Sequence, residues 1–173
     1  MLRLLLTLLP LVLLNLLVSQ LNHALAPWHV SLFVGGLLVV FTALQLDFDT
    51  GFAAVFLAGL FCDAASPVRF GTHAFLFATA HTLIFSVRSR LPRGETLVSL
   101  VFALLANLGI FIALSLTLMA HAPLPFGVWP RLLLNLLCSQ VFLALIAPWF
   151  FALQARALAP DGFELRDTSR RLM

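Results

Sequence analysis

Residues 96–119 read TLVSLVFALLANLGIFIALSLTLM and contain no charged side chain. A helix needs about 20 mostly apolar residues to cross the roughly 30 Å hydrocarbon core of a bilayer. This stretch meets that requirement, and Asn107 is its only amide side chain. The stretch therefore predicts a transmembrane helix, and the segments on either side of it extend the same pattern.

The composition of the whole chain agrees with a membrane protein. The 173 residues are 62% hydrophobic and only 10% charged, with a mean hydropathy of +1.08. A soluble domain carries about 25% charged residues. All basic residues are arginines, and the pI near 10.1 reflects sparse charge, so we expect no nucleic-acid partner. Lipid must cover the excess apolar surface, because no soluble core of this size could bury it.

Six apolar runs predict an all-α, polytopic membrane protein with about six transmembrane helices in one compact bundle. We expect one domain over residues 1–155 and a short charged tail over 156–173. The first run is longer than the apolar region of a cleaved signal peptide, so we interpret it as a membrane helix. The third run must either draw in flanking residues or cross only half of the bilayer, because it spans only about 21 Å as a helix. The runs cover residues 4–21, 30–46, 52–65, 70–87, 96–119 and 132–153.

The arginines predict the orientation of these spans. With six spans and both termini in the cytoplasm, only Arg69 and Arg131 of the 10 basic residues face the outside. Cytoplasmic loops of membrane proteins carry an excess of basic residues. We therefore predict that both termini are cytoplasmic.

The stretch from Thr50 to Gly71 predicts a tightly packed helical hairpin. Small residues recur on one helical face that ends at Asp63, which allows a neighbouring helix to approach closely. A buried aspartate needs a partner, and Arg69, across the turn, is the expected one. The hairpin serves either to contact a partner or ligand, or it is an ordinary helix end with an ion pair. The residues of this candidate site are Gly51, Gly59, Asp63, Ser66, Pro67, Arg69 and Gly71.

Other polar residues in the apolar runs predict contacts between helices. His73 and His81 lie about 12 Å apart along one helix, too far to share a metal ion, so we expect satisfied interhelical histidines. Asn107 has the same interpretation. Asn135 lies four residues before Ser139 and forms with it a polar stripe suited to helix–helix hydrogen bonds.

The sequence contains no motif of an enzyme. It has no nucleotide-binding loop, nucleophile elbow, metalloprotease helix or cysteine cluster. Asp47 and Asp49 precede a predicted helix start, where we expect Asp49 or Thr50 to cap the helix. We therefore predict a protein that is not an enzyme, with no cofactor and no metal.

The hairpin resembles the signature of MreD, the small multi-pass subunit of the bacterial rod-shape-determining system. The resemblance rests on Thr50-Gly51-Phe52, Gly59-Leu60, Asp63, Ser66-Pro67 and Gly71, together with Pro148-Trp149 and Arg156 near the end of the last run. It implies a fold similar to the substrate-binding subunits of vitamin-uptake transporters. It also implies localisation in the bacterial cytoplasmic (inner) membrane.

The resemblance implies that the chain is a non-enzymatic scaffold of the cell-elongation machinery. It would lie in membrane lipid and bind an MreC-like single-span protein. The further partners would be an MreB-like filament, a RodA-like glycosyltransferase and its transpeptidase, which together build sidewall peptidoglycan. The alternative is a substrate-binding subunit of a vitamin or small-molecule uptake transporter. That function requires converging polar side chains near the outer face, and the sequence offers few of them. A pore would need polar stripes on several helices, which are missing.

Overall fold

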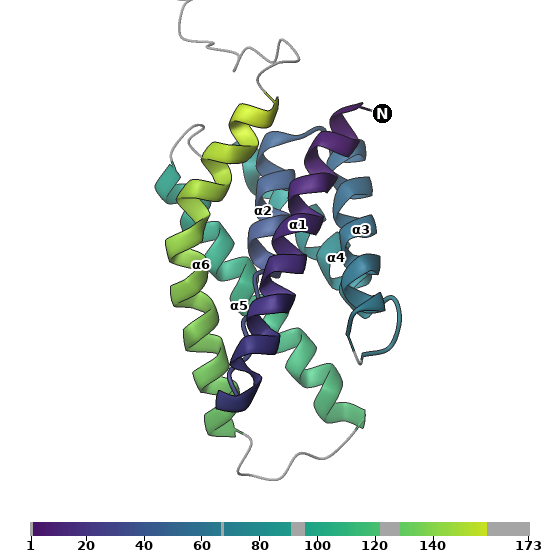
Figure 1. Cartoon of the computed structure of the whole chain (residues 1–173). Helices are drawn as coiled ribbons and strands as arrows, with labels where there is room; N and C mark the ends of the chain where they lie inside the picture. The colour runs from purple at the N-terminus through teal and green to yellow at the C-terminus, as the bar shows by residue number, and fades with distance from the viewer. Residues whose placement is uncertain (1, 67, 91–95, 122–128, 159–173) are drawn as a thin grey trace, which may run out of the picture.

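The computed structural model describes residues 2–66, 68–90, 96–121 and 129–158. Within these residues the chain is helical and contains no strand. Six α-helices run alternately up and down, so the chain forms one bundle (Figure 1). Short 3₁₀ turns follow the first and fourth helices, at Ala26–Trp28 and Arg88–Arg90. The helices are α1 (Leu2–Leu25), α2 (Gly35–Gln45), α3 (Phe48–Ala64), α4 (Thr72–Val87), α5 (Thr96–His121) and α6 (Trp129–Leu158).

Helix α2 lies at the centre of the bundle. Every residue from Gly35 to Ala43 is buried, and α3, α4, α5 and α6 all contact the helix. The closest approach is at Gly36, where an added Cβ would lie 2.3 Å from the backbone nitrogen of Asn107 on α5. Arg88 closes the other end of α2, where its guanidinium donates to the carbonyl oxygens of Ala43 and Leu46. Helices α3 to α6 therefore pack around one short helix that is buried along most of its length.

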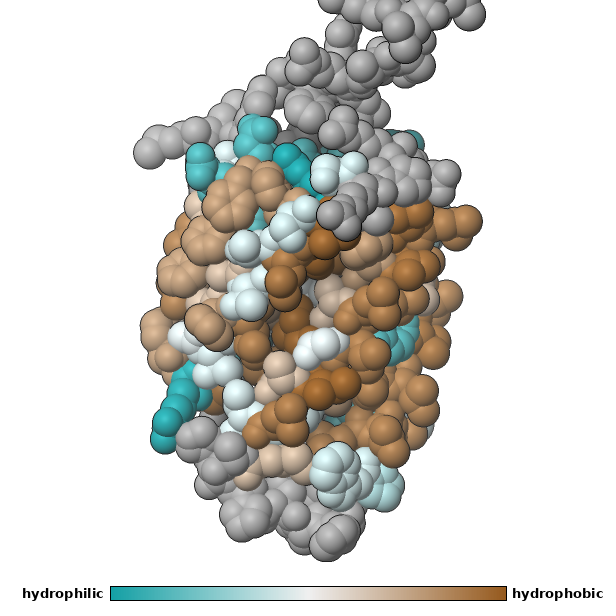
Figure 2. All heavy atoms as spheres, turned by 180° about the vertical axis from the view of Figure 1, so that it is seen from behind, coloured by the Kyte–Doolittle hydropathy of each residue, from teal (hydrophilic) through white to brown (hydrophobic). Residues whose placement is uncertain are grey.

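The outer surface of the bundle is apolar. Helices α1, α5 and α6 are each long and apolar enough to cross a membrane, and most of their surface faces outward. Leu97, Leu137 and Leu145 are among the leucines that they expose. Figure 2 shows hydrophobic side chains over most of the middle of one face, with most of the hydrophilic ones toward its two ends. The chain is therefore a helical membrane protein, because such a surface is stable only in lipid.

The prediction of a continuous helix over residues 30–46 was wrong in its first part. Residues 30–34 form no helix and lead directly into α2, which is only 11 residues long. An 11-residue helix spans about 17 Å, so this part of the chain is a half-length helix preceded by irregular backbone. Irregular backbone inside a membrane protein needs hydrogen-bond partners from neighbouring elements, and the 30–34 segment has them.

The third apolar run forms a helix that includes flanking residues, which is the first of the two alternatives that we predicted for it. Helix α3 begins at Phe48 and has 17 residues, or about 25 Å. The prediction that Asp49 or Thr50 caps this helix was wrong. The residue before the helix is Asp47, and its side chain makes no capping hydrogen bond.

In the predicted tail, residues 156–158 belong to α6 and residues 159–173 lie outside the described part of the chain.

Candidate functional site

The predicted small-residue face of α3 is the face that the bundle buries. Gly59 packs directly against the backbone of α4, since a Cβ added there would lie 2.5 Å from the Cα of Ala74. Only glycine allows the two helices to lie this close. The buried residues of α3 are Gly51, Ala54, Val55, Ala58, Gly59, Cys62 and Asp63. The expected close approach of α3 and α4 is therefore confirmed.

Asp63 binds the N-terminus of α4 from the end of α3. Its Oδ2 accepts hydrogen bonds from the backbone nitrogens of Gly71, at 2.9 Å, and Ala74, at 3.2 Å. Its Oδ1 accepts one from the backbone nitrogen of His73, at 2.9 Å, and lies 2.8 Å from His73 Nδ1. The side chain of Asp63 is fully buried. The carboxylate thus satisfies orphan N–H groups at the positive end of a helix dipole, as an N-cap does, but from a different helix.

The predicted ion pair between Asp63 and Arg69 was wrong. Asp63 pairs with His73, whereas the side chain of Arg69 is exposed. Arg69 contributes through its backbone, since its carbonyl oxygen accepts hydrogen bonds from the backbone nitrogen and the hydroxyl of Thr72. Gly71 adopts a φ of 95°, which brings the start of α4 back under the carboxylate. Within the predicted turn, Ser66 is half-buried and Pro67 lies outside the described residues.

His81 does not have the hydrogen-bonded surroundings that we expected. It is completely buried, and neither ring nitrogen has a hydrogen-bond partner within the described residues. Its ring lies among those of Phe48, Phe52 and Phe85. Gly51 faces it, because a Cβ added there would lie 2.7 Å from His81 Nε2. The prediction of a satisfied histidine is therefore wrong for His81 and correct for His73, whose Nδ1 contacts Asp63.

Side chains from three other helices hold the 30–34 segment and the start of α2. Helix α6 contributes Asn135 and Ser139, the two residues of the polar stripe, and helix α5 contributes Asn107. The Nδ2 atom of Asn107 has no partner within the described residues. We did not single out Asn22 of α1 from the sequence. Its position just after the first apolar run suggested a connecting loop and gave no indication that it contacts the 30–34 segment. The bonds are Ser31 N to Asn135 Oδ1 (3.1 Å), Phe33 N to Ser139 Oγ (3.0 Å), Gly36 N to Asn107 Oδ1 (3.2 Å), Leu32 N to Asn22 Oδ1 (2.6 Å) and Asn22 Nδ2 to Leu32 O (2.9 Å).

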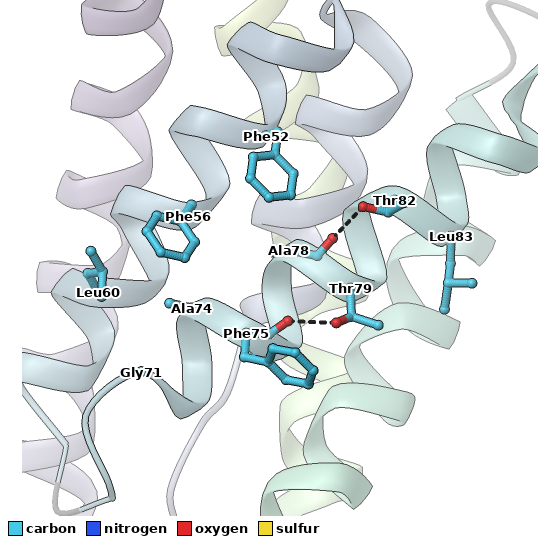
Figure 3. Close-up of a pocket in the computed structure, with 10 residues that line it drawn as sticks. All are labelled: Phe52, Phe56, Leu60, Gly71, Ala74, Phe75, Ala78, Thr79, Thr82 and Leu83. Carbon is cyan, nitrogen blue, oxygen red and sulfur yellow. Dashed lines mark hydrogen bonds between the residues drawn. The ribbon is translucent and has the colours of Figure 1, made fainter.

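A groove of about 600 Å³ opens between α3 and α4 on the outside of the bundle. Ala74 and Ala78, four residues apart, are buried small residues of α4 within it, and phenylalanines of both helices flank them (Figure 3). The hydroxyls of Thr79 and Thr82 donate to carbonyl oxygens of their own helix, so they offer the groove no free hydrogen. The lining residues are Phe52, Phe56, Leu60, Gly71, Ala74, Phe75, Ala78, Thr79, Thr82 and Leu83.

No protein-family model, curated protein or solved structure matches the chain. Within the described residues, no three histidine, cysteine or acidic side chains come together as they would around a metal ion. The structure thus brings Asp63, Gly71 and His73 together and leaves Arg69 and His81 apart from them. What this arrangement can do is hold two helices rigidly and present an apolar groove beside them.

Proposed function

We propose that this chain is a non-enzymatic membrane scaffold that binds another membrane protein through the α3–α4 hairpin. The observation that carries the proposal is the groove between α3 and α4. It is apolar, its threonine hydroxyls are satisfied internally, and the small side chains of Ala74 and Ala78 leave it open between the flanking phenylalanines. An apolar transmembrane helix could occupy it without leaving a polar group unpaired.

The rigidity of the hairpin supports this proposal. The close contact of Gly59 with Ala74 and the four contacts of Asp63 fix α3 relative to α4. A preformed surface loses less conformational entropy when a partner binds, so more of the contact energy appears as affinity. The hairpin therefore suits partner binding better than it suits a purely local structural role.

The MreD-like residues of the same hairpin suggest which machinery the scaffold serves. We propose the bacterial cell-elongation system, in which the chain would bind an MreC-like single-span protein. An MreB-like filament, a RodA-like glycosyltransferase and its transpeptidase would complete the assembly that makes sidewall peptidoglycan. The chain would lie in the cytoplasmic membrane as a six-span bundle.

The distribution of arginines supports an orientation with both termini in the cytoplasm. Arg88 and Arg156 lie toward the end of the bundle at which α1 begins and α6 ends. Arg69 and Arg131 lie toward the opposite end, in the α3–α4 turn and at the start of α6. The end that carries both chain termini would face the cytoplasm under the positive-inside rule.

Depletion of the protein from its own cells tests the proposed function. We expect rod-shaped cells to become round, because sidewall synthesis would lose its organising subunit. Re-expression of the wild-type chain should restore the rods. Cells that keep their normal shape through complete depletion would contradict the proposal.

A polar cavity between α1, α2 and the hairpin favours uptake of a small molecule as a second candidate function. Its volume is about 150 Å³. Sites for drug-sized ligands usually measure about 300–1,000 Å³, so this cavity is too small for most vitamins. The scaffold is therefore the better-supported function, and normal cell shape on depletion with a vitamin recovered one-to-one with the chain would reverse that preference.

A further inference from the structure

The polar cavity lies where the irregular 30–34 segment becomes helix α2. Its walls include Asn15 and Ser19 of α1, Ser66 after α3, and His73 of α4. Val34 and Gly35, at the start of α2, also line it. At about 30 Å³ of liquid volume per water molecule, 150 Å³ corresponds to roughly five waters. The cavity is thus large enough for a small solute and has polar walls inside an otherwise apolar bundle.

Two backbone donors in this cavity have no partner in the described part of the chain. Leu32, Phe33 and Gly36 donate their N–H groups to side chains, whereas the N–H groups of Val34 and Gly35 donate to no side chain and to no backbone carbonyl among the described residues. Both residues are buried. Buried N–H groups are almost always paired, and these two lie at the positive end of the α2 dipole. An oxygen of an anionic group is the natural partner for two such donors.

His73, which also lines the cavity, adds a third unpaired polar atom. Its side chain is 7% exposed, and its Nδ1 is held by Asp63. With Asp63 ionised, Nδ1 carries the hydrogen, which leaves Nε2 as an acceptor. Nε2 makes no hydrogen bond within the described residues. The site therefore offers donors at the start of α2 and an acceptor at His73.

We propose that this cavity binds a small α-amino or α-hydroxy carboxylate. The carboxylate would accept from the N–H groups of Val34 and Gly35, and the ammonium or hydroxyl would donate to His73 Nε2. The buried charge of Asp63 behind the imidazole favours an ammonium over a second anion at that end. This site is independent of the scaffold function, so either proposal can fail without the other.

Amide NMR on the full-length chain in lipid nanodiscs tests the site, with valine and glycine labelled by ¹⁵N. The titrants are glycine and lactate, with acetate lacking the donor and ethylamine lacking the carboxylate. We expect saturable shifts of the Val34 and Gly35 amides with glycine or lactate. Acetate should bind about tenfold more weakly, because one hydrogen bond is lost, and ethylamine should have no effect. The amide of Gly109, which has open space around it, is the internal control.

Two variants alter the walls of the cavity. His73→Leu should lower the affinity for glycine to that for acetate and leave acetate binding unchanged. Ser19→Phe places a bulky ring at an exposed position of the cavity wall and should abolish the shifts without touching the core. Absence of saturable shifts with glycine and lactate in the wild type would overturn the proposal. Equal affinity for acetate and glycine, or glycine binding unchanged by both variants, would also overturn it.

Discussion

At the scale of single residues, Asp63 is the side chain on which the hairpin depends most. It accepts hydrogen bonds from three backbone N–H groups at the start of α4 and contacts the His73 imidazole. Removing the carboxylate leaves buried donors unpaired, at a cost of about 1–3 kcal/mol for each. Its contribution therefore comes from capping a neighbouring helix, which differs from the role of an ordinary ion pair with arginine.

Asp63→Ala should accordingly destabilise the protein by about 3 kcal/mol or more, because three N–H groups lose their acceptor. Arg69→Ala should stay within about 0.5 kcal/mol of wild type, because the Arg69 side chain is exposed. Reversible unfolding in mixed micelles measures both. Equal destabilisation by the two substitutions would show that the carboxylate pairs with Arg69 after all.

Gly59 offers a second test at this scale. Gly59→Ala should destabilise the bundle by about 1–3 kcal/mol, because the new Cβ would meet the backbone of Ala74 at 2.5 Å and would push α3 from α4. Gly109→Ala is the matched control, since nothing lies near its added Cβ and alanine favours the helix by up to about 1 kcal/mol. The same micelle unfolding compares them, and a neutral Gly59→Ala would refute the close approach.

The sequence predicted the face of α3 but not the partners of its polar residues. Gly51, Gly59 and Asp63 recur at helical spacing, so their common face follows from 3.6 residues per turn. Which donor reaches Asp63 depends on how the turn before Gly71 folds back, and Arg69 was the nearer charge in sequence. His81 could not be assigned correctly either, because its aromatic neighbours come from another helix and from its own.

At the scale of elements, the broken second span is the feature that hydropathy alone could not predict. Residues 30–34 are Val-Ser-Leu-Phe-Val, and their apolar character is continuous with that of α2. Whether such a run becomes a helix depends on which groups accept hydrogen bonds from its backbone N–H groups. Here Asn22 on α1 and the Asn135–Ser139 stripe on α6 supply the acceptors, from positions far apart in sequence.

Asn135→Ala and Ser139→Ala test this explanation of the segment. Ser139→Ala should destabilise the protein by about 1–3 kcal/mol, because it leaves the part-buried N–H of Phe33 without its acceptor. Asn135→Ala should cost only about 0.5–1.5 kcal/mol, because the N–H of Ser31 is exposed. Ser115→Ala is the control, since its hydroxyl bonds only to the carbonyl of Phe111 on its own helix. Thermal unfolding in detergent ranks the three variants. If Ser115→Ala costs as much as the other two, the stripe has no special role.

At the scale of the whole molecule, four of the six α-helices pack around the short central helix α2, inside an apolar surface. Composition and run lengths predicted the helical membrane class, because lipid is the only solvent for such a surface. Helices α1, α5 and α6 are long enough to span by themselves, whereas α2 needs the segment before it. The number of crossings and their direction therefore remain predictions that need a separate measurement.

Alkaline phosphatase fusions provide that measurement, because the enzyme is active only outside the cytoplasm. Fusions after residues 25, 68 and 125 should be active, and a fusion after residue 173 should be inactive. The physical reason is the excess of arginine at the end that carries both termini. Activity of the fusion at residue 173 would reject a six-span chain with cytoplasmic termini.

Affinity purification of the tagged chain from its native membranes tests the proposed partner binding most directly. Thr79→Phe should fill the groove and reduce recovery of the partner at least fivefold. Ser86→Phe is the control, since Ser86 is exposed on the same helix outside the groove and also bonds to its own backbone. We predict that a single-span, MreC-like protein co-purifies in a fixed ratio with the wild-type chain and with Ser86→Phe, but not with Thr79→Phe. Recovery of no single-span protein, or equal recovery with both variants, would contradict the proposed scaffold.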